Sequence, residues 1–124
     1  MALERILVAY DGSEPAFRAL EQAAEVGQVE DAQVDLVIVG TPELHDPETI
    51  IQQAVGYLCD RGFDPEVHIR FGDPAGSIRR VADEEGYDAV YMGTRGHAAH
   101  LSPLSPSVSG AVVELAHVTT VVAH

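Results

Sequence analysis

Short apolar runs alternate along this chain with longer segments in which apolar residues recur at helical spacing. Val34–Val39 is almost continuously apolar, and Ile6–Ala9 and Ala89–Met92 are shorter runs of the same kind. Such runs are typical of strands buried on both faces of a parallel sheet. Glu66–Phe71 alternates polar and apolar residues and predicts a more edge-like strand, and Thr119–Ala123 predicts a fifth strand.

Four helices are predicted between these strands, each marked by capping or turn residues. They are Pro15 to Val26 with Gly27 as its stop, a helix that Asp46 caps and Gly62 closes, a helix through Ile78 and Val81 that ends near Gly86, and Ser107 to His117.

The alternation of strands and helices predicts one α/β domain over residues 1–124. We expect a five-stranded parallel sheet with helices on both faces, a three-layer α/β/α arrangement, and the strand order 3-2-1-4-5. In open sheets of this kind, ligands bind beyond the carboxyl ends of the strands, where the winding reverses. That rule points to the turn after the first strand, which holds Asp11, and the turn after the fourth, which holds Gly93.

The charge of the chain limits its partners. Twenty acidic residues face seven basic ones, all of them arginine, and the net charge is −13. A surface this acidic repels nucleic acid and anionic lipid, so neither is expected as a partner. One hypothesis is a halophilic protein that works at high ionic strength, where salt screens the self-repulsion. The alternative is an ordinary acidic protein of a mesophile.

The chain has a single cysteine, Cys59, which excludes an internal disulfide and favours a reducing compartment. Cys59 lies on the apolar face of the second predicted helix, where we expect it to fill the core. The start, Met1 to Arg5, leads directly into a strand without a signal segment, and no apolar run approaches bilayer length. We therefore expect a cytoplasmic protein without a membrane partner.

Three motifs at successive strand–helix junctions resemble those of the universal stress protein family. They are Arg5-Ile-Leu-Val-Ala-Tyr-Asp-Gly-Ser13, Gly72-Asp-Pro-Ala-Gly-Ser-Ile78 and Asp88-Ala-Val-Tyr-Met-Gly-Thr-Arg-Gly96. The resemblance covers essentially the whole length, and three motifs in the right order are more specific than a lone glycine pattern. It implies the adenine-nucleotide α-hydrolase-like fold and a homodimer formed through the C-terminal strand.

The ATP-binding branch of that family carries the pattern Gly-x2-Gly-x9-Gly-Ser or Thr. Here Gly93 and Gly96 match, but Pro106-Ser107 stands where Gly-Ser is expected. By resemblance, Gly93 and Gly96 form the turn around the phosphates, and Ser107 donates its hydroxyl to them. The resemblance also places Asp11 against the adenosine part and Val39 against the adenine.

Pro106 weakens the phosphate half of this pattern. Proline has no N–H to donate, although it is well tolerated at the first position of a helix. If Ser105 caps that helix, it also accepts the N–H of Ser107 or Val108, which a phosphate would need. Losing one such bond costs on the order of 1.5 to 3 kcal/mol, roughly tenfold to more than a hundredfold in affinity. Arg95 is the one permanent cation nearby.

Structural roles compete with the nucleotide-binding roles. Asp11 is equally well explained as a residue that caps the first helix. Gly93 and Gly96 are also explained if they supply positive φ after a strand, although two glycines also permit close backbone approach. A metal site at His97 and His100 is disfavoured, because two prolines argue against the helix that their spacing assumes. The remaining histidines are His45, His68, His117 and His124, which show no ligand constellation and read as packed or solvated residues.

Two functions follow from the resemblance. The first is a stress-response sensor or switch that binds an adenine nucleotide (ATP, ADP or AMP), with Mg²⁺ arriving together with the nucleotide. No general base stands out near the phosphate turn, so any ATP hydrolysis is expected to be slow. The second is a non-binding family member that acts through dimerisation and partner contacts. An adenylating enzyme is disfavoured, because Asp11-Gly-Ser13 replaces the expected Ser-Gly-Gly loop.

Overall fold

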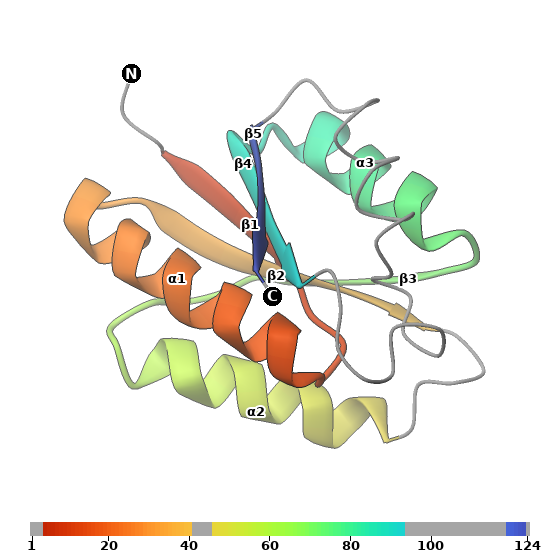
Figure 1. Cartoon of the computed structure of the whole chain (residues 1–124), viewed down its shortest axis with the longest axis horizontal. Helices are drawn as coiled ribbons and strands as arrows, with labels where there is room; N and C mark the ends of the chain where they lie inside the picture. The colour runs from red at the N-terminus through yellow and green to blue at the C-terminus, as the bar shows by residue number, and fades with distance from the viewer. Residues whose placement is uncertain (1–3, 41–45, 94–118, 124) are drawn as a thin grey trace.

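The computed structural model describes residues 4–40, 46–93 and 119–123 (Figure 1). A parallel five-stranded sheet, in the order β3-β2-β1-β4-β5, confirms the predicted fold class and strand order. The fourth predicted helix, 107–117, lies outside the described residues. In chain order the elements are β1 (Arg5–Ala9), α1 (Glu14–Glu30), β2 (Gln33–Gly40), α2 (Pro47–Cys59), β3 (Val67–Phe71), α3 (Pro74–Glu85), β4 (Ala89–Gly93) and β5 (Thr119–Ala123).

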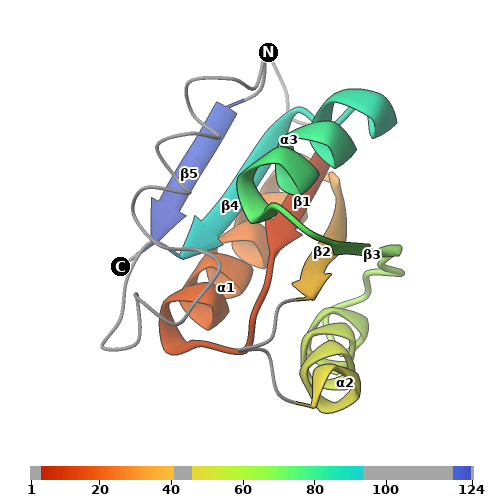
Figure 2. The same cartoon turned by 90° about the vertical axis from the view of Figure 1, so that its right-hand side faces the viewer.

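The described helices cover both faces of the sheet. Helices α1 and α2 lie on one face and α3 lies on the other, as the two perpendicular views show (Figures 1 and 2). Helix α1 packs on β1 and β4, whereas α3 packs on β2 and β3. This placement follows from right-handed crossovers that run first toward β3 and then back across β1 to β4. No helix in the described part of the chain is long and apolar enough to span a bilayer.

The centre of the sheet forms the core, and β3 forms an edge. All residues of β4 are buried, and four of the five in β1 are buried. By contrast, β3 leaves Ile69 46 % and Phe71 79 % exposed. Continuous burial explains the continuous apolar runs of the central strands, and the partly solvated β3 explains the alternating pattern of its sequence.

The predicted end of the first helix at Gly27 is wrong. Helix α1 continues to Glu30 and ends at Asp31, which adopts a left-handed conformation (φ 55°). Gly27 is buried inside the helix, where a Cβ atom would lie 2.7 Å from a methyl of Val34 and 3.1 Å from the ring of Phe63. The glycine therefore allows the helix to approach β2 closely, and tertiary packing outweighs its low helix propensity.

The prediction that Cys59 fills the core is also wrong, because its side chain is exposed. Ala54 and Leu58 are the fully buried residues of α2. Cys59 follows Leu58 by one position, which turns its side chain about 100° around the helix axis and away from the sheet. Its position as the last residue of the helix also leaves it beyond the packed turns.

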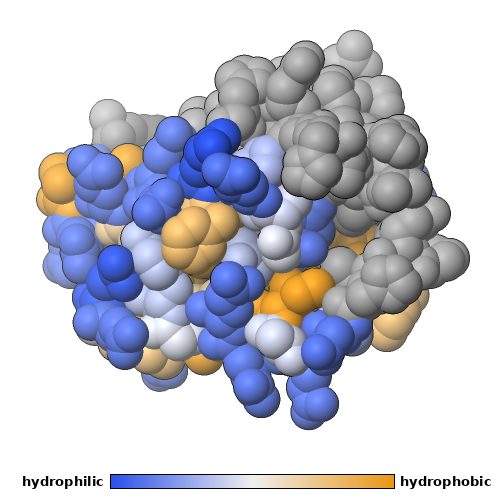
Figure 3. Space-filling model, turned by 60° about the horizontal axis from the view of Figure 1, so that its bottom comes forward, coloured by the Kyte–Doolittle hydropathy of each residue, from blue (hydrophilic) through white to orange (hydrophobic). Residues whose placement is uncertain are grey.

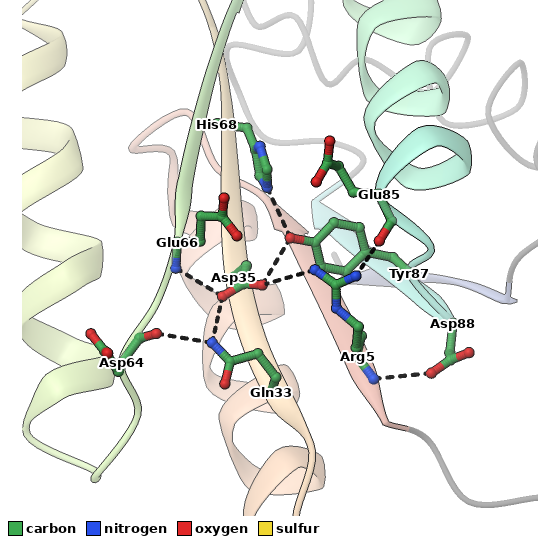
Figure 4. A network of polar contacts seen from close by, with 9 residues as sticks. All are labelled: Arg5, Gln33, Asp35, Asp64, Glu66, His68, Glu85, Tyr87 and Asp88. Carbon is green, nitrogen blue, oxygen red and sulfur yellow. Dashed lines mark hydrogen bonds and ion pairs between the residues drawn. The ribbon is translucent and has the colours of Figure 1, made fainter.

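A buried carboxylate joins the strands at their amino-terminal ends (Figure 4). Asp35 of β2 is 1 % exposed. Its oxygens accept hydrogen bonds from Gln33 Nε2, from the Glu66 backbone N–H and from the Tyr87 hydroxyl, each 2.8 Å long. Burying a carboxylate is costly unless it is hydrogen-bonded, and three donors meet that requirement here.

Arg5 and Asp88 extend this network to β1. The Arg5 guanidinium lies 3.9 Å from the Asp35 carboxylate, stacks 4.5 Å from the centre of the Tyr87 ring and donates to the Glu85 carbonyl. Asp88 accepts the Arg5 backbone N–H at 3.0 Å. Burial, together with the hydrogen bond to Asp35, raises the pKa of the Tyr87 hydroxyl. The polar network thus ties together the amino ends of β1, β2, β3 and β4.

Removing the Tyr87 hydroxyl should therefore destabilise the fold. We expect Tyr87→Phe to lower the free energy of unfolding by about 1–3 kcal/mol, because the buried Asp35 carboxylate loses a donor. Tyr10→Phe is the matched control, since the Tyr10 hydroxyl donates at 2.9 Å to Gln53, an exposed side chain that water can serve instead. Urea unfolding of both variants checks this, and equal losses would contradict the role given to Asp35.

Candidate functional site

The turn after β1 is built around Asp11. The Asp11 carboxylate accepts the Ser13 backbone N–H at 2.9 Å, and Ser13 Oγ accepts the Ala16 backbone N–H at 3.3 Å. Ser13 is therefore the N-cap of α1, and the alternative in which Asp11 caps this helix is wrong. Asp11 instead closes a local turn in front of the cap, a common arrangement for aspartate.

Gly12 gives this turn its shape. It adopts φ 84°, which a residue with a side chain rarely tolerates, and a Cβ atom there would lie 3.1 Å from the Ile50 side chain. The turn after β1 therefore rests on the first turn of α2.

Gly93 brings the end of β4 against the start of α1. A Cβ atom on Gly93 would lie 2.4 Å from the Pro15 carbonyl carbon and 2.5 Å from the Ala16 nitrogen. Its φ is not in the left-handed region, so the alternative in which Gly93 supplies positive φ is wrong. Only a residue without a side chain allows the strand and the helix backbone to approach this closely.

The two turns leave adjacent strands at the same edge of the sheet. Ala9 of β1 pairs with Met92 of β4. Gly93 follows Met92 directly, and Asp11 lies two positions after Ala9, so both leave the sheet at the same level. The winding of the sheet reverses here, because β2 lies on one side of β1 and β4 lies on the other. The carboxyl edge between β1 and β4 is therefore the position where open α/β sheets bind ligands.

Two further residues of this edge are buried. Val39, near the end of β2, is 5 % exposed, so it lines the edge from within the core. Tyr10 precedes Asp11 and donates its hydroxyl to Gln53. Burial, and then the negative charge of Asp11, raise the pKa of Tyr10 to about 12, so its hydroxyl stays protonated at neutral pH.

The sequence analysis predicted part of this edge. Asp11, Val39 and Gly93 lie at the carboxyl ends of their strands, as predicted. Ser13 was expected only as a turn or capping residue and Pro15 only as the start of the first helix, and Tyr10 was given no role. The segment Tyr10–Pro15 could have pointed to these residues, because polar and turn residues collect there between the first apolar run and a helix start. The other predicted site residues lie outside the described residues: Arg95, Gly96, Ser107 and Val108.

Comparison with known proteins decides the family. A model of the Universal stress protein family matches residues 2–57 and 48–124. The chain belongs to the universal stress protein family. A search among curated protein sequences found no match for this universal stress protein.

Solved structures share its fold over nearly the whole length. A universal stress protein in complex with cAMP has 23 % identity and a TM-score of 0.81, and the match covers 100 % of this chain and 98 % of that one. The universal stress protein from Archaeoglobus fulgidus in complex with dAMP has 23 % identity and a TM-score of 0.77, and the match covers 100 % of both chains. A universal stress protein family protein from Arabidopsis thaliana with AMP bound has 21 % identity and a TM-score of 0.73, and the match covers 98 % of this chain and 92 % of that one.

The contact at Gly93 can be tested by adding one methyl group. We expect Gly93→Ala to cost about 1–3 kcal/mol or more, because the methyl overlaps backbone atoms that cannot move without shifting α1. Gly56→Ala is the control: no atom lies within 4 Å of its Cβ position, and the site is inside α2. That substitution should stabilise by about 0.5–1 kcal/mol. If urea unfolding gives Gly93→Ala the same free energy of unfolding as the wild type, the close contact is refuted.

Proposed function

We propose that this universal stress protein binds an adenine nucleotide at the carboxyl edge between β1 and β4 and acts as a sensor or switch. The observation that carries the proposal is the contact of Gly93 with the first turn of α1. The start of α1, which follows the Asp11 turn, therefore lies against the end of β4, at the point where the sheet reverses its winding. Solved relatives with cAMP, dAMP and AMP support this choice of ligand.

The proposed contacts divide into a nucleoside half and a phosphate half. In the nucleoside half, Asp11 faces the adenosine and Val39 contacts the adenine. The Asp11 carboxylate, which accepts the Ser13 N–H, is the acceptor that we propose for the hydroxyls of the ligand. The phosphate half consists of Gly93, Arg95, Gly96, Ser107 and Val108.

The preferred nucleotide follows from the weaker phosphate half. Pro106 has no N–H, so the chain offers one phosphate donor fewer than the intact motif. A nucleotide with one phosphate needs fewer hydrogen-bond donors from this segment than a nucleotide with three phosphates. We therefore propose AMP as the preferred ligand over ATP, with Mg²⁺ arriving only as the companion of a di- or triphosphate.

Thermal unfolding with nucleotide tests the proposed function. A ligand at 100 times its Kd adds roughly 2.7 kcal/mol of stability and raises the melting temperature. We expect AMP to raise the melting temperature more than ATP with Mg²⁺ does at equal millimolar concentration. GMP serves as the base control. No shift with any adenine nucleotide would contradict the proposal and favour the non-binding alternative.

Two variants separate binding from folding. Asp11→Asn keeps a side-chain oxygen for the Ser13 N–H but removes the charge, so it should fold normally and weaken AMP binding by roughly tenfold or more. Pro106→Gly restores a backbone donor and should tighten ATP binding by at least about tenfold. Unchanged affinity in Pro106→Gly would show that the proline is not the obstacle.

The second candidate function is partner contact through a dimer. Strand β5 is the outer strand of the sheet and pairs with β4 in the described part of the chain. An edge strand offers backbone donors and acceptors to a second strand, so we propose a homodimer through β5. Sedimentation equilibrium should give twice the chain mass of 13.2 kDa. A monomeric mass at micromolar concentration would contradict the dimer.

The acidic surface favours the halophilic hypothesis. Hydrophilic residues cover most of the described part of the face in Figure 3, and apolar areas on it are small and separated. With a net charge of −13, salt should relieve repulsion in the folded state. We therefore propose that the melting temperature rises from dilute buffer to molar KCl. Equal melting temperatures in both would count against it.

A further inference from the structure

Three potential metal ligands meet at the amino-terminal edge of the sheet, opposite the proposed nucleotide site. Glu66 precedes β3, His68 lies within β3, and Glu85 is the last residue of α3. One potential ligand atom from each lies within 4.8 Å of the other two. Figure 4 shows the two glutamate side chains on either side of the His68 ring. The topology thus brings the end of α3 next to the segment Glu66–His68.

His68 is the fixed member of this group. It is 7 % exposed, and its Nε2 lies 2.9 Å from the Tyr87 hydroxyl oxygen. The Tyr87 hydroxyl donates its own hydrogen to the Asp35 carboxylate. The tyrosine oxygen is therefore left to accept a hydrogen from His68 Nε2, and the neutral ring keeps its lone pair on Nδ1. A histidine whose second nitrogen donates into a hydrogen-bonded carboxylate network is the usual form of a metal ligand.

The same network holds both glutamates by their backbones and leaves their side chains in solvent. The Glu66 N–H donates to Asp35, and the Glu85 carbonyl accepts from Arg5. Ligand atoms at about 2.0–2.2 Å from a zinc ion lie roughly 3–3.5 Å apart, so the carboxylates must close in by about 1 Å. Exposed glutamates achieve this by a change of rotamer, around a ring that does not move.

The donor set determines the class of ion. An imidazole with two carboxylates suits zinc and neighbouring first-row transition metals, whereas Mg²⁺ and Ca²⁺ prefer oxygen ligands alone. The Arg5 charge nearby is compensated, because Arg5 pairs with Asp35. We propose that Glu66, His68 and Glu85 bind a divalent transition-metal ion of the zinc type, with its remaining positions open to water. The ion links the edge strand β3 to the end of α3.

Calorimetric titration of the full chain with Zn²⁺ tests this site. We expect Glu66→Gln/Glu85→Gln to weaken Zn²⁺ binding by at least about 10- to 100-fold, the loss typical of removing even a supporting residue. Glu21→Gln/Glu25→Gln on the exposed face of α1 is the matched control, because it removes the same charge elsewhere. Its Zn²⁺ affinity should equal that of the wild type. If both double variants lose the same amount of Zn²⁺ affinity, the ion is attracted by the acidic surface in general, and the proposal is overturned.

Histidine NMR identifies the residue that the ion contacts, which matters in a chain with six histidines. One equivalent of Zn²⁺ should shift the ring nitrogen signals of His68 in the wild type and leave them unchanged in Glu66→Gln/Glu85→Gln. One equivalent of Mg²⁺ should not shift them in either. A Zn²⁺ titration that shifts other histidines and not His68 would place the metal elsewhere and overturn the proposal.

Discussion

Gly93, the last residue of β4, lies with its backbone against Pro15 and Ala16, and this contact sets the distance between the end of β4 and the start of α1. The register of β1 with β4 brings both turns to one edge, and Gly93 then allows α1 to start directly against β4. A side chain at this position would push the helix start away, together with the turn of Asp11. The candidate site thus depends on a packing requirement first and on polar groups second.

The opposite edge of the sheet carries the buried charge. Asp35 is 1 % exposed and bonds to groups that lead into or lie in β2, β3 and β4, while Arg5 adds β1. Removing one partner from such a network leaves a buried group without its hydrogen bond, so the network favours one arrangement of the strand ends. Polar contacts thus hold the amino ends of the strands, whereas the proposed nucleotide site lies at the opposite, carboxyl ends.

The fold was predictable because buried parallel strands leave continuous apolar runs, and capping residues mark the helix starts. The errors arose where tertiary contacts decide: Gly27 lies inside a helix because Val34 and Phe63 need the space, and Cys59 is one position past the buried face. The polar network escaped prediction, since Asp35 is one polar residue within an apolar run. Of the candidate site, the positions of Asp11 and Gly93 at the carboxyl edge were predictable from topology and motif. The close contact of Gly93 with Pro15 and Ala16 was not.

The proposed nucleotide site lies at the carboxyl edge of the sheet, where β1 and β4 end. Backbone amide NMR of the chain titrated with AMP tests this most directly. If AMP binds there, we expect saturable shifts at Asp11, Gly12, Ser13, Gly40 and Gly93, and no shifts at Asp35, His68 and Tyr87. Shifts confined to the amino-terminal edge, or none at millimolar AMP, would contradict it.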